Sequence, residues 1–250
     1  MMSLTGANLL VTVKKQYFFK LKAYVFLFFN MIAVQILGIL LSFNGVMSSG
    51  TGNGGFFVSV KTFAGNLIII LTMIWAFFVG RSLTTDEYRK TDFVFVTNRL
   101  SSNLSAAGFA LTAAIVGGVT ASLSGVLFRI IVYFTYGSQN IADQHFFVKP
   151  QELLMSMIAT TFYIILISAI GYFFGTLARK HPGFNVLLPA AFVGLLFLRV
   201  GNVGNISVVL EETVNFFIKE GSLMLFMIKI TGVVFALFYS SILMSNRLEV

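Results

Sequence analysis

The side chains able to perform acid–base, metal or nucleophilic chemistry are few and scattered. The chain has two histidines, His145 and His181, nine acidic residues and no cysteine. A protein metal site usually needs several closely spaced ligands, and neither histidine has a second one at ligand spacing. The sequence also lacks a GxxxxGK[ST] phosphate loop. We therefore expect no catalytic residue, bound metal or cofactor on this chain, and ATP hydrolysis would require another polypeptide.

One polar stretch, residues 81–103 with the sequence RSLTTDEYRKTDFVFVTNRLSSN, places charges on both sides of the apolar run at 93–96. A long loop that keeps apolar side chains is expected to fold against something. We predict that it docks on a partner protein, with the apolar run as anchor and the charges giving specificity. A solvated loop with a small local core is the alternative. The candidate contact residues are Asp86, Glu87, Arg89, Lys90, Asp92, Phe93, Phe95, Thr97 and Arg99.

The composition places this loop beside a membrane. Hydrophobic residues make up 57% of the 250 residues, charged residues make up 10%, and the mean hydropathy is +0.91. So much apolar surface cannot be hidden in one soluble core. The net charge of +8 does not indicate nucleic-acid binding, because the cations are spread between apolar stretches instead of forming one continuous patch. The absence of cysteine fits a bacterial inner membrane.

Apolar stretches of nearly 20 residues are expected to cross the bilayer as helices. We predict one all-α permease-like domain, residues 1–250, in which an amphipathic interfacial helix at 4–22 precedes the spans. Leu9, Leu10, Val13, Tyr17 and Leu21 can share one face of that helix. Lys14, Lys15, Lys20 and Lys22 would meet lipid headgroups. The predicted spans are residues 23–43, 62–79, 104–127, 152–177, 183–198 and 222–244.

The distribution of lysine and arginine predicts that both termini are cytoplasmic, because short cytoplasmic loops are enriched in these residues. The 81–103 loop and the turn at 178–182 would lie on that side. Arg179 and Lys180 in this turn are further candidate contacts of the same partner protein. The expected external loops are residues 44–61, 129–150 and 199–221. Within the last of these, residues 206–219 are apolar enough to form a short helix on the outer surface.

Small residues recur at every fourth position in two of the predicted spans. Such a stripe lets another helix approach closely. Packing is the favoured interpretation, although a smooth stripe can also let helices slide in a transporter. The residues concerned are Ala113, Gly117, Ala121, Gly125, Gly171 and Gly175.

No acidic residue lies at mid-membrane depth, where a proton relay or ion-coupled carrier usually keeps one, so secondary transport is not favoured. Uncharged amides within spans mostly join helices. Lys229 can either snorkel outward or line an external vestibule for acidic or zwitterionic cargo. The candidate residues of a substrate path are Asn30, Gln35, Asn66, Lys229, Arg129 and Arg199.

The order of these elements resembles the permease subunit of ABC transporters of the type-2 exporter class. Residues 87–101 look like that family's glutamate, threonine, apolar run and Thr/Ser-containing turn. The segment 175–178, Gly-Thr-Leu-Ala, looks like its Gly-Thr-Leu motif at the end of the fourth span. The resemblance implies that the 81–103 loop docks in a groove of a P-loop ATPase that binds ATP and Mg. It also implies two ATPase copies and a second permease subunit, identical or sister, in membrane lipid.

The sequence therefore predicts a transport subunit, not an enzyme, in the cell (inner) membrane. Export is expected because the outer loops are too short to dock a binding protein extensively. Apolar spans favour an amphipathic or hydrophobic cargo such as a membrane-active peptide, an antibiotic or a lipid-linked compound. A channel or scaffold subunit without ATP coupling remains the alternative, and a membrane-embedded enzyme would need a cluster of reactive groups that the sequence lacks.

Overall fold

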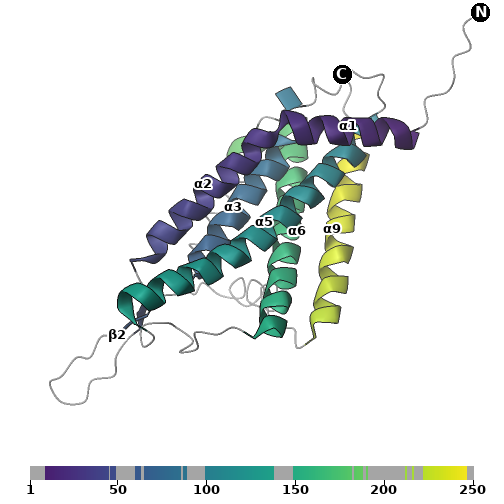
Figure 1. Cartoon of the computed structure of the whole chain (residues 1–250). Coiled ribbons are helices and arrows are strands. Elements are labelled where there is room, and N and C mark those ends of the chain that lie inside the picture. Colours follow the sequence, from purple (N-terminus) through teal and green to yellow (C-terminus); the bar gives the residue numbers. More distant parts are fainter. Residues whose placement is uncertain are drawn as a thin grey trace, which may run out of the picture. The chain divides into compact units, whose positions relative to one another are not determined.

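A computed structural model describes residues 9–44, 46–48, 60–62, 65–85, 87–88, 99–137, 149–181, 183–187, 190, 212, 216 and 222–246. Its long helices are α1 (Leu9–Ala23), α2 (Val25–Ser42), α3 (Asn66–Ser82), α5 (Arg99–Tyr136), α6 (Pro150–Lys180) and α9 (Leu223–Asn246) (Figure 1). The strands β1 (Val46–Ser48) and β2 (Val60–Thr62) form a short antiparallel pair in which Val46 lies opposite Thr62. The described chain is otherwise helical, as the sequence predicts.

Four of the described helices, α2, α5, α6 and α9, are long and apolar enough to cross a membrane, and α3 is a shorter apolar helix. These five coincide with five of the six predicted spans. Only residues 183–187 and 190 of the predicted span at 183–198 lie within the described part. Of the predicted outer segment at 206–219, only Glu212 and Phe216 do. The chain is thus a multi-pass helical protein by length and composition.

The helix ends differ from the predicted ones. α5 begins at Arg99 and continues to Tyr136, so the end of the 81–103 loop and the start of the predicted outer loop at 129–150 are helical. α6 begins with Pro150, has Glu152 in its first turn and ends with Arg179 and Lys180. Proline at the first helical position, acid in the first turn and cations in the last turn all favour these ends. The turn predicted at 178–182 therefore starts later, after Lys180.

The chain divides into two compact units. The first unit comprises residues 1–20, 77–110 and 166–250, and the second comprises residues 21–76 and 111–165. Helices α1, α3, α5 and α6 each contribute residues to both units, whereas α9 belongs wholly to the first and α2 to the second.

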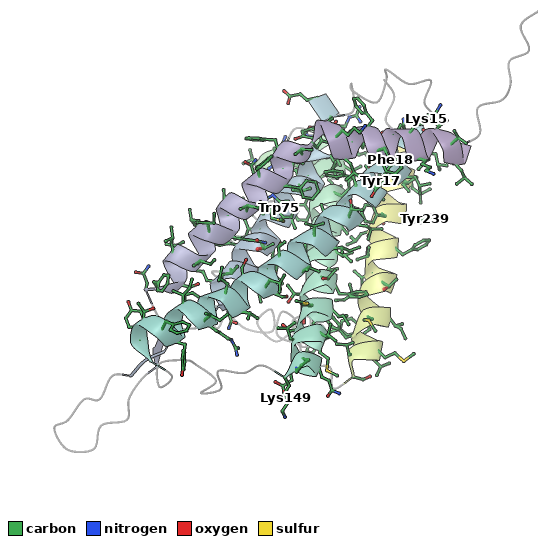
Figure 2. All side chains as sticks on the ribbon, viewed as in Figure 1. Lys15, Tyr17, Phe18, Trp75, Lys149 and Tyr239 are labelled. Atoms are coloured by element: carbon green, nitrogen blue, oxygen red, sulfur yellow. The ribbon has the colours of Figure 1, made fainter. Side chains whose placement is uncertain are left out.

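In the second unit α2, α3 and α5 pack through small residues and a few polar bonds. A Cβ added at Gly38 would lie 3.0 Å from the Ile68 Cα, so α2 and α3 approach closely there. The indole N–H of Trp75 on α3 donates to the Leu27 carbonyl oxygen of α2 at 3.1 Å, and Figure 2 labels Trp75 beside α2. Gln35 Nε2 donates to Thr120 Oγ1 at 2.9 Å. The apolar core of this unit is formed by Ile68, Phe128 and Val132 with Ile39 and Phe43.

In the first unit α9 packs against the second half of α6, residues 166–180, and these two segments run in the same direction (Figure 1). The Tyr172 and Phe238 rings, one from each helix, are 5.2 Å apart between centroids. The end of α3 packs against α6, where the Phe77 and Phe174 rings are 5.7 Å apart. α6 is therefore in contact with both α3 and α9 in this unit.

The outward surfaces of the helices are apolar. Phe26 on α2 is 71% exposed, Phe134 on α5 81% and Phe235 on α9 73%. Large apolar side chains on several helix faces are expected where the surrounding solvent is lipid. This surface agrees with the membrane setting that the composition predicts.

Candidate functional site

The 81–103 loop is described at both ends. Residues 81–85, 87–88 and 99–103 belong to the described part, and the side chain of Arg99, the first residue of α5, is outside it. The other predicted contact residues outside the described part are Asp86, Arg89, Lys90, Asp92, Phe93, Phe95 and Thr97. The candidate site is therefore built from the two ends of the loop and the helices that hold them.

The first end of the loop lies against the end of α6. Thr84 Oγ1 donates to the Arg81 carbonyl oxygen at 2.7 Å, which closes the turn after α3. A Cβ added at Gly175 of α6 would overlap Thr84 Oγ1 and lie 3.0 Å from that carbonyl oxygen. Arg81 Nη2 donates to Asn185 Oδ1 at 3.0 Å. Since Asn185 follows α6 in the chain, two successive contacts join the loop's beginning to the region around the end of α6.

The second end of the loop lies against α1 through a buried lysine. Lys20 is only 2% exposed. Its Nζ donates to Ser105 Oγ at 2.8 Å and to the Ser102 carbonyl oxygen at 3.2 Å. The prediction that Lys20 meets lipid headgroups is therefore wrong, whereas Lys14, Lys15 and Lys22 are exposed. These two hydrogen bonds join α1 to the beginning of α5.

The inward face of α1 is polar, because Gln16, one turn before Lys20, is fully buried as well. Both amide atoms of Gln16 lack a hydrogen-bond partner. The large apolar side chains Leu9, Leu10 and Phe18 are exposed instead. The predicted apolar face of α1 is thus divided, since Leu9 and Leu10 are exposed while Tyr17 packs against Gly108, whose added Cβ would lie 3.4 Å from Tyr17 Cδ2.

The beginning of α5 is also joined to α6. The Tyr172 hydroxyl donates to Asn103 Oδ1 at 2.9 Å, and both side chains are buried. Tyr172 in turn contacts Phe238 of α9. The first two turns of α5, immediately after the loop, therefore contact α1 on one side and α6 on another.

Replacing Tyr172 with phenylalanine tests the contact between α5 and α6. We expect a loss of about 1–2 kcal/mol for a buried hydrogen bond, or about 3–6 °C in the thermal midpoint of a chain of this size. Tyr239→Phe is the matched control, because Tyr239 is 57% exposed on α9. Scanning fluorimetry in detergent would measure both, and equal shifts for the two variants would contradict the assignment.

Glu87 and Tyr88 are the described residues in the middle of the loop. Burial, and secondarily the neighbouring Glu87 carboxylate, raises the pKa of the Tyr88 phenol above its ordinary value. Burial disfavours the charged phenolate and the adjacent negative charge disfavours it further. Tyr88 therefore stays neutral and adds a partly buried aromatic ring to the loop.

Arg179 and Lys180 lie in the last turn of α6. They follow Gly175, the residue of α6 that lies against Thr84. Both are exposed. His181 follows them, and its Nδ1 accepts the Gly183 backbone N–H at 3.1 Å. His181 is exposed, and this hydrogen bond gives it a structural role in the turn.

The described residues that were predicted for a substrate path have different environments. Asn30 and Asn66 are exposed, and Gln35 is bonded to Thr120. Arg129 lies within α5, not in a loop. Lys229 Nζ lies 4.2 Å from the centroid of the Phe216 ring, which is within the range of a cation–π contact. The sequence led us to expect this side chain either to snorkel outward or to line a vestibule. Arg199 and His145 lie outside the described residues.

The small-residue positions differ in their neighbours. Ala113 and Ala121 are buried, and a Cβ at Gly117 would lie 3.2 Å from Trp75 Cζ3. A Cβ at Gly125 would have nothing within 4 Å. A Cβ at Gly171 would overlap the Phe77 carbonyl oxygen. Gly171 therefore lies at a close approach of α3 and α6, and Gly175 lies against the turn that follows α3.

Sequence reasoning missed two close approaches. A Cβ at Gly118 would lie 2.7 Å from the Thr161 Cα, and one at Gly80 would overlap the Ser168 carbonyl oxygen. For the approach of Gly118 to Thr161, the only indication in the sequence was the pair of adjacent glycines, Gly117 and Gly118. Gly80 stands before Arg81 near a helix end, where a glycine is ordinarily interpreted as a stop signal.

In the described ranges no three His, Cys, Asp or Glu side chains gather where they could hold a metal ion. Comparisons with family models, curated proteins and solved structures found no match to this chain.

Proposed function

We propose that this chain is the transmembrane permease subunit of an ATP-driven exporter of the ABC type-2 class. In this proposal it forms a dimer with itself or a sister permease, and two P-loop ATPase subunits supply ATP hydrolysis. The 81–103 loop docks on the ATPase, with Phe93 and Phe95 as anchors and its charges as specificity contacts. The cargo is amphipathic or hydrophobic, and a membrane-active peptide is preferred to an antibiotic.

The observation that carries the proposal is that both ends of the 81–103 loop are held by contacts with neighbouring helices. Thr84 and Arg81 contact the α6 region, while Ser102 and Ser105 hold Lys20 of α1 and Asn103 is bonded to Tyr172. A loop that is clamped in this way transmits a displacement at its tip to α1, α3, α5 and α6. A loop that serves only as a solvated connection has no need of such contacts.

The proposed topology has both termini in the cytoplasm. Because α6 and α9 run in the same direction, the chain must return between them, and the predicted span at 183–198 supplies that return. The loop, Arg179 and Lys180 then share the cytoplasmic side, where lysine and arginine are favoured. The exposed apolar faces of α2, α5 and α9 favour lipid as the surrounding medium.

The test is purification of the intact chain from its native membranes in mild detergent, with identification of co-purifying proteins, beside the double variant Phe93→Asp, Phe95→Asp. We expect a P-loop ATPase with the intact chain and at least a tenfold loss of it with the variant. Burying a charge in an apolar contact without a partner costs several kcal/mol, which is sufficient for such a loss.

The matched control is Phe146→Asp, Phe147→Asp, which makes the same chemical change in a predicted outer loop and should retain the ATPase. Membrane insertion of all three chains is checked by their yield and their elution in size-exclusion chromatography. If no ATPase co-purifies, or if the 93/95 variant retains it unchanged, the channel or scaffold function replaces this proposal.

A further inference from the structure

A cavity of about 530 Å³ lies in the first unit beyond the end of α6. Its apolar walls are Leu177 of α6, Phe184 and Leu187 of the following turn, and Met244 of α9. This volume falls within the range of ordinary ligand sites in proteins. All of these residues belong to the first unit, so the cavity is formed by elements that pack together.

The polar rim of the cavity is basic. Lys180 and His181 line it, both side chains are exposed, and none of the lining residues that the structure describes carries a carboxylate. Because His181 Nδ1 accepts the Gly183 N–H, the proton of the neutral ring is on Nε2. The rim therefore presents an ammonium group and an imidazole N–H, which are both donors to an anion. The His181 ring is also held edge-on to Phe184, at 6.4 Å between centroids.

A cation in the last turn of α6 would by itself only stabilise the helix end. The second feature here is the open apolar pocket directly beside it, which we call the chamber. Leu187 is 59% exposed and Val186 74% exposed, so the chamber opens onto an apolar surface. Such a combination fits a ligand with an anionic head and an apolar tail.

We propose that this cavity binds one anionic phospholipid, with its phosphate between Lys180 and His181 and the beginning of an acyl chain against Leu187 and Met244. The cavity lies at the ends of α6 and α9, where a chain crossing the bilayer meets the headgroup layer. Basic residues at this level attract anionic lipids electrostatically. The site shares the membrane topology and Lys180, a candidate ATPase contact, with the proposed transport function, but lipid binding does not require a docked ATPase.

The test is native mass spectrometry of the purified full chain titrated with phosphatidylglycerol or with phosphatidylcholine of the same acyl chains. For the first lipid bound, we expect at least fivefold tighter binding of phosphatidylglycerol, since each cation near the headgroups contributes about that factor. The double variant Lys180→Gln, His181→Gln should bring the two affinities to within twofold. Lys149→Gln removes an exposed cation elsewhere and should change neither.

Met244→Trp fills the chamber from α9 and should weaken the first binding step for phosphatidylglycerol without touching either donor. A titration with glycerol 1-phosphate separates the lipid from its free headgroup, and we expect no binding of it at concentrations that saturate the lipid. The proposal is overturned if the double variant keeps the preference for phosphatidylglycerol, if Met244→Trp has no effect, or if glycerol 1-phosphate binds as well as the lipid. ATPase co-purification is unaffected by these outcomes, so failure here and failure of the transport proposal are distinguishable.

Discussion

Gly171→Ala should lower the thermal midpoint of the purified chain by about 5–10 °C. The added Cβ would overlap the backbone carbonyl oxygen of Phe77, and it would also lie 3.1 Å from the Phe77 Cα. Because backbone atoms cannot rotate away as a side chain can, α3 and α6 must separate. Overpacking of this kind typically costs about 1–3 kcal/mol, and the lost contacts include the nearby pair of Phe77 and Phe174.

The control for this prediction is Gly232→Ala in α9, where a Cβ would meet nothing within 4 Å. An alanine is intrinsically about 1 kcal/mol better than glycine inside a helix, so this variant should leave the midpoint unchanged or raise it. Scanning fluorimetry in one detergent gives both midpoints. A Gly171→Ala midpoint equal to or above that of the unmodified chain would show that the two helices do not approach each other as described.

Lys20→Ala should release α1 from the beginning of α5. The substitution removes the hydrogen bonds to Ser105 and to the Ser102 carbonyl oxygen and leaves a void at a side chain that is 2% exposed. With about 0.5–1.5 kcal/mol for each of the two hydrogen bonds, we expect amide hydrogen exchange in α1 to become about 5- to 150-fold faster. Hydrogen-exchange mass spectrometry on the full chain measures this.

Two further variants isolate the cause. Lys15→Ala makes the same change at an exposed position of the same helix and should leave exchange within about twofold of the unmodified chain, as surface substitutions usually do. Lys20→Met keeps the length of the side chain but removes the donors, so exchange faster than in the unmodified chain would assign the effect to the hydrogen bonds. Equal exchange rates in the Lys20→Ala and Lys15→Ala variants would contradict the conclusion that α1 holds the end of the loop through Lys20.

The membrane setting and most helix positions were predictable from the sequence. Long apolar stretches specify helices in lipid, because unpaired backbone N–H and C=O groups are too costly there. The start of α6 at Pro150 and its cationic last turn are equally local signals. A polar stretch between α3 and α5 was predictable from its charged residues, although its last five residues belong to α5. Its function, the ATPase partner and the cargo remain proposals.

The elements that hold the loop were not predictable. Nothing in the spacing of Lys20, Ser105, Asn103 and Tyr172 indicates that they meet, because the contacts join residues that are 69 to 85 positions apart. Lys20 looks like one more headgroup contact beside Lys22. It is buried because the beginning of α5 offers it oxygen acceptors, which is a property of the packed helices.

The sequence by itself thus determined that this chain lies in lipid, where its helices run and where its polar loop interrupts them, because these depend on composition and local length. Only the tertiary structure decided which face of each helix turns inward. In water an apolar stripe marks the buried face, but a helix in lipid can be apolar all round, so periodicity carries little information about orientation. Close contacts such as Gly80 with Ser168 and Gly118 with Thr161 arise from the approach of two helices, and neither helix encodes them alone.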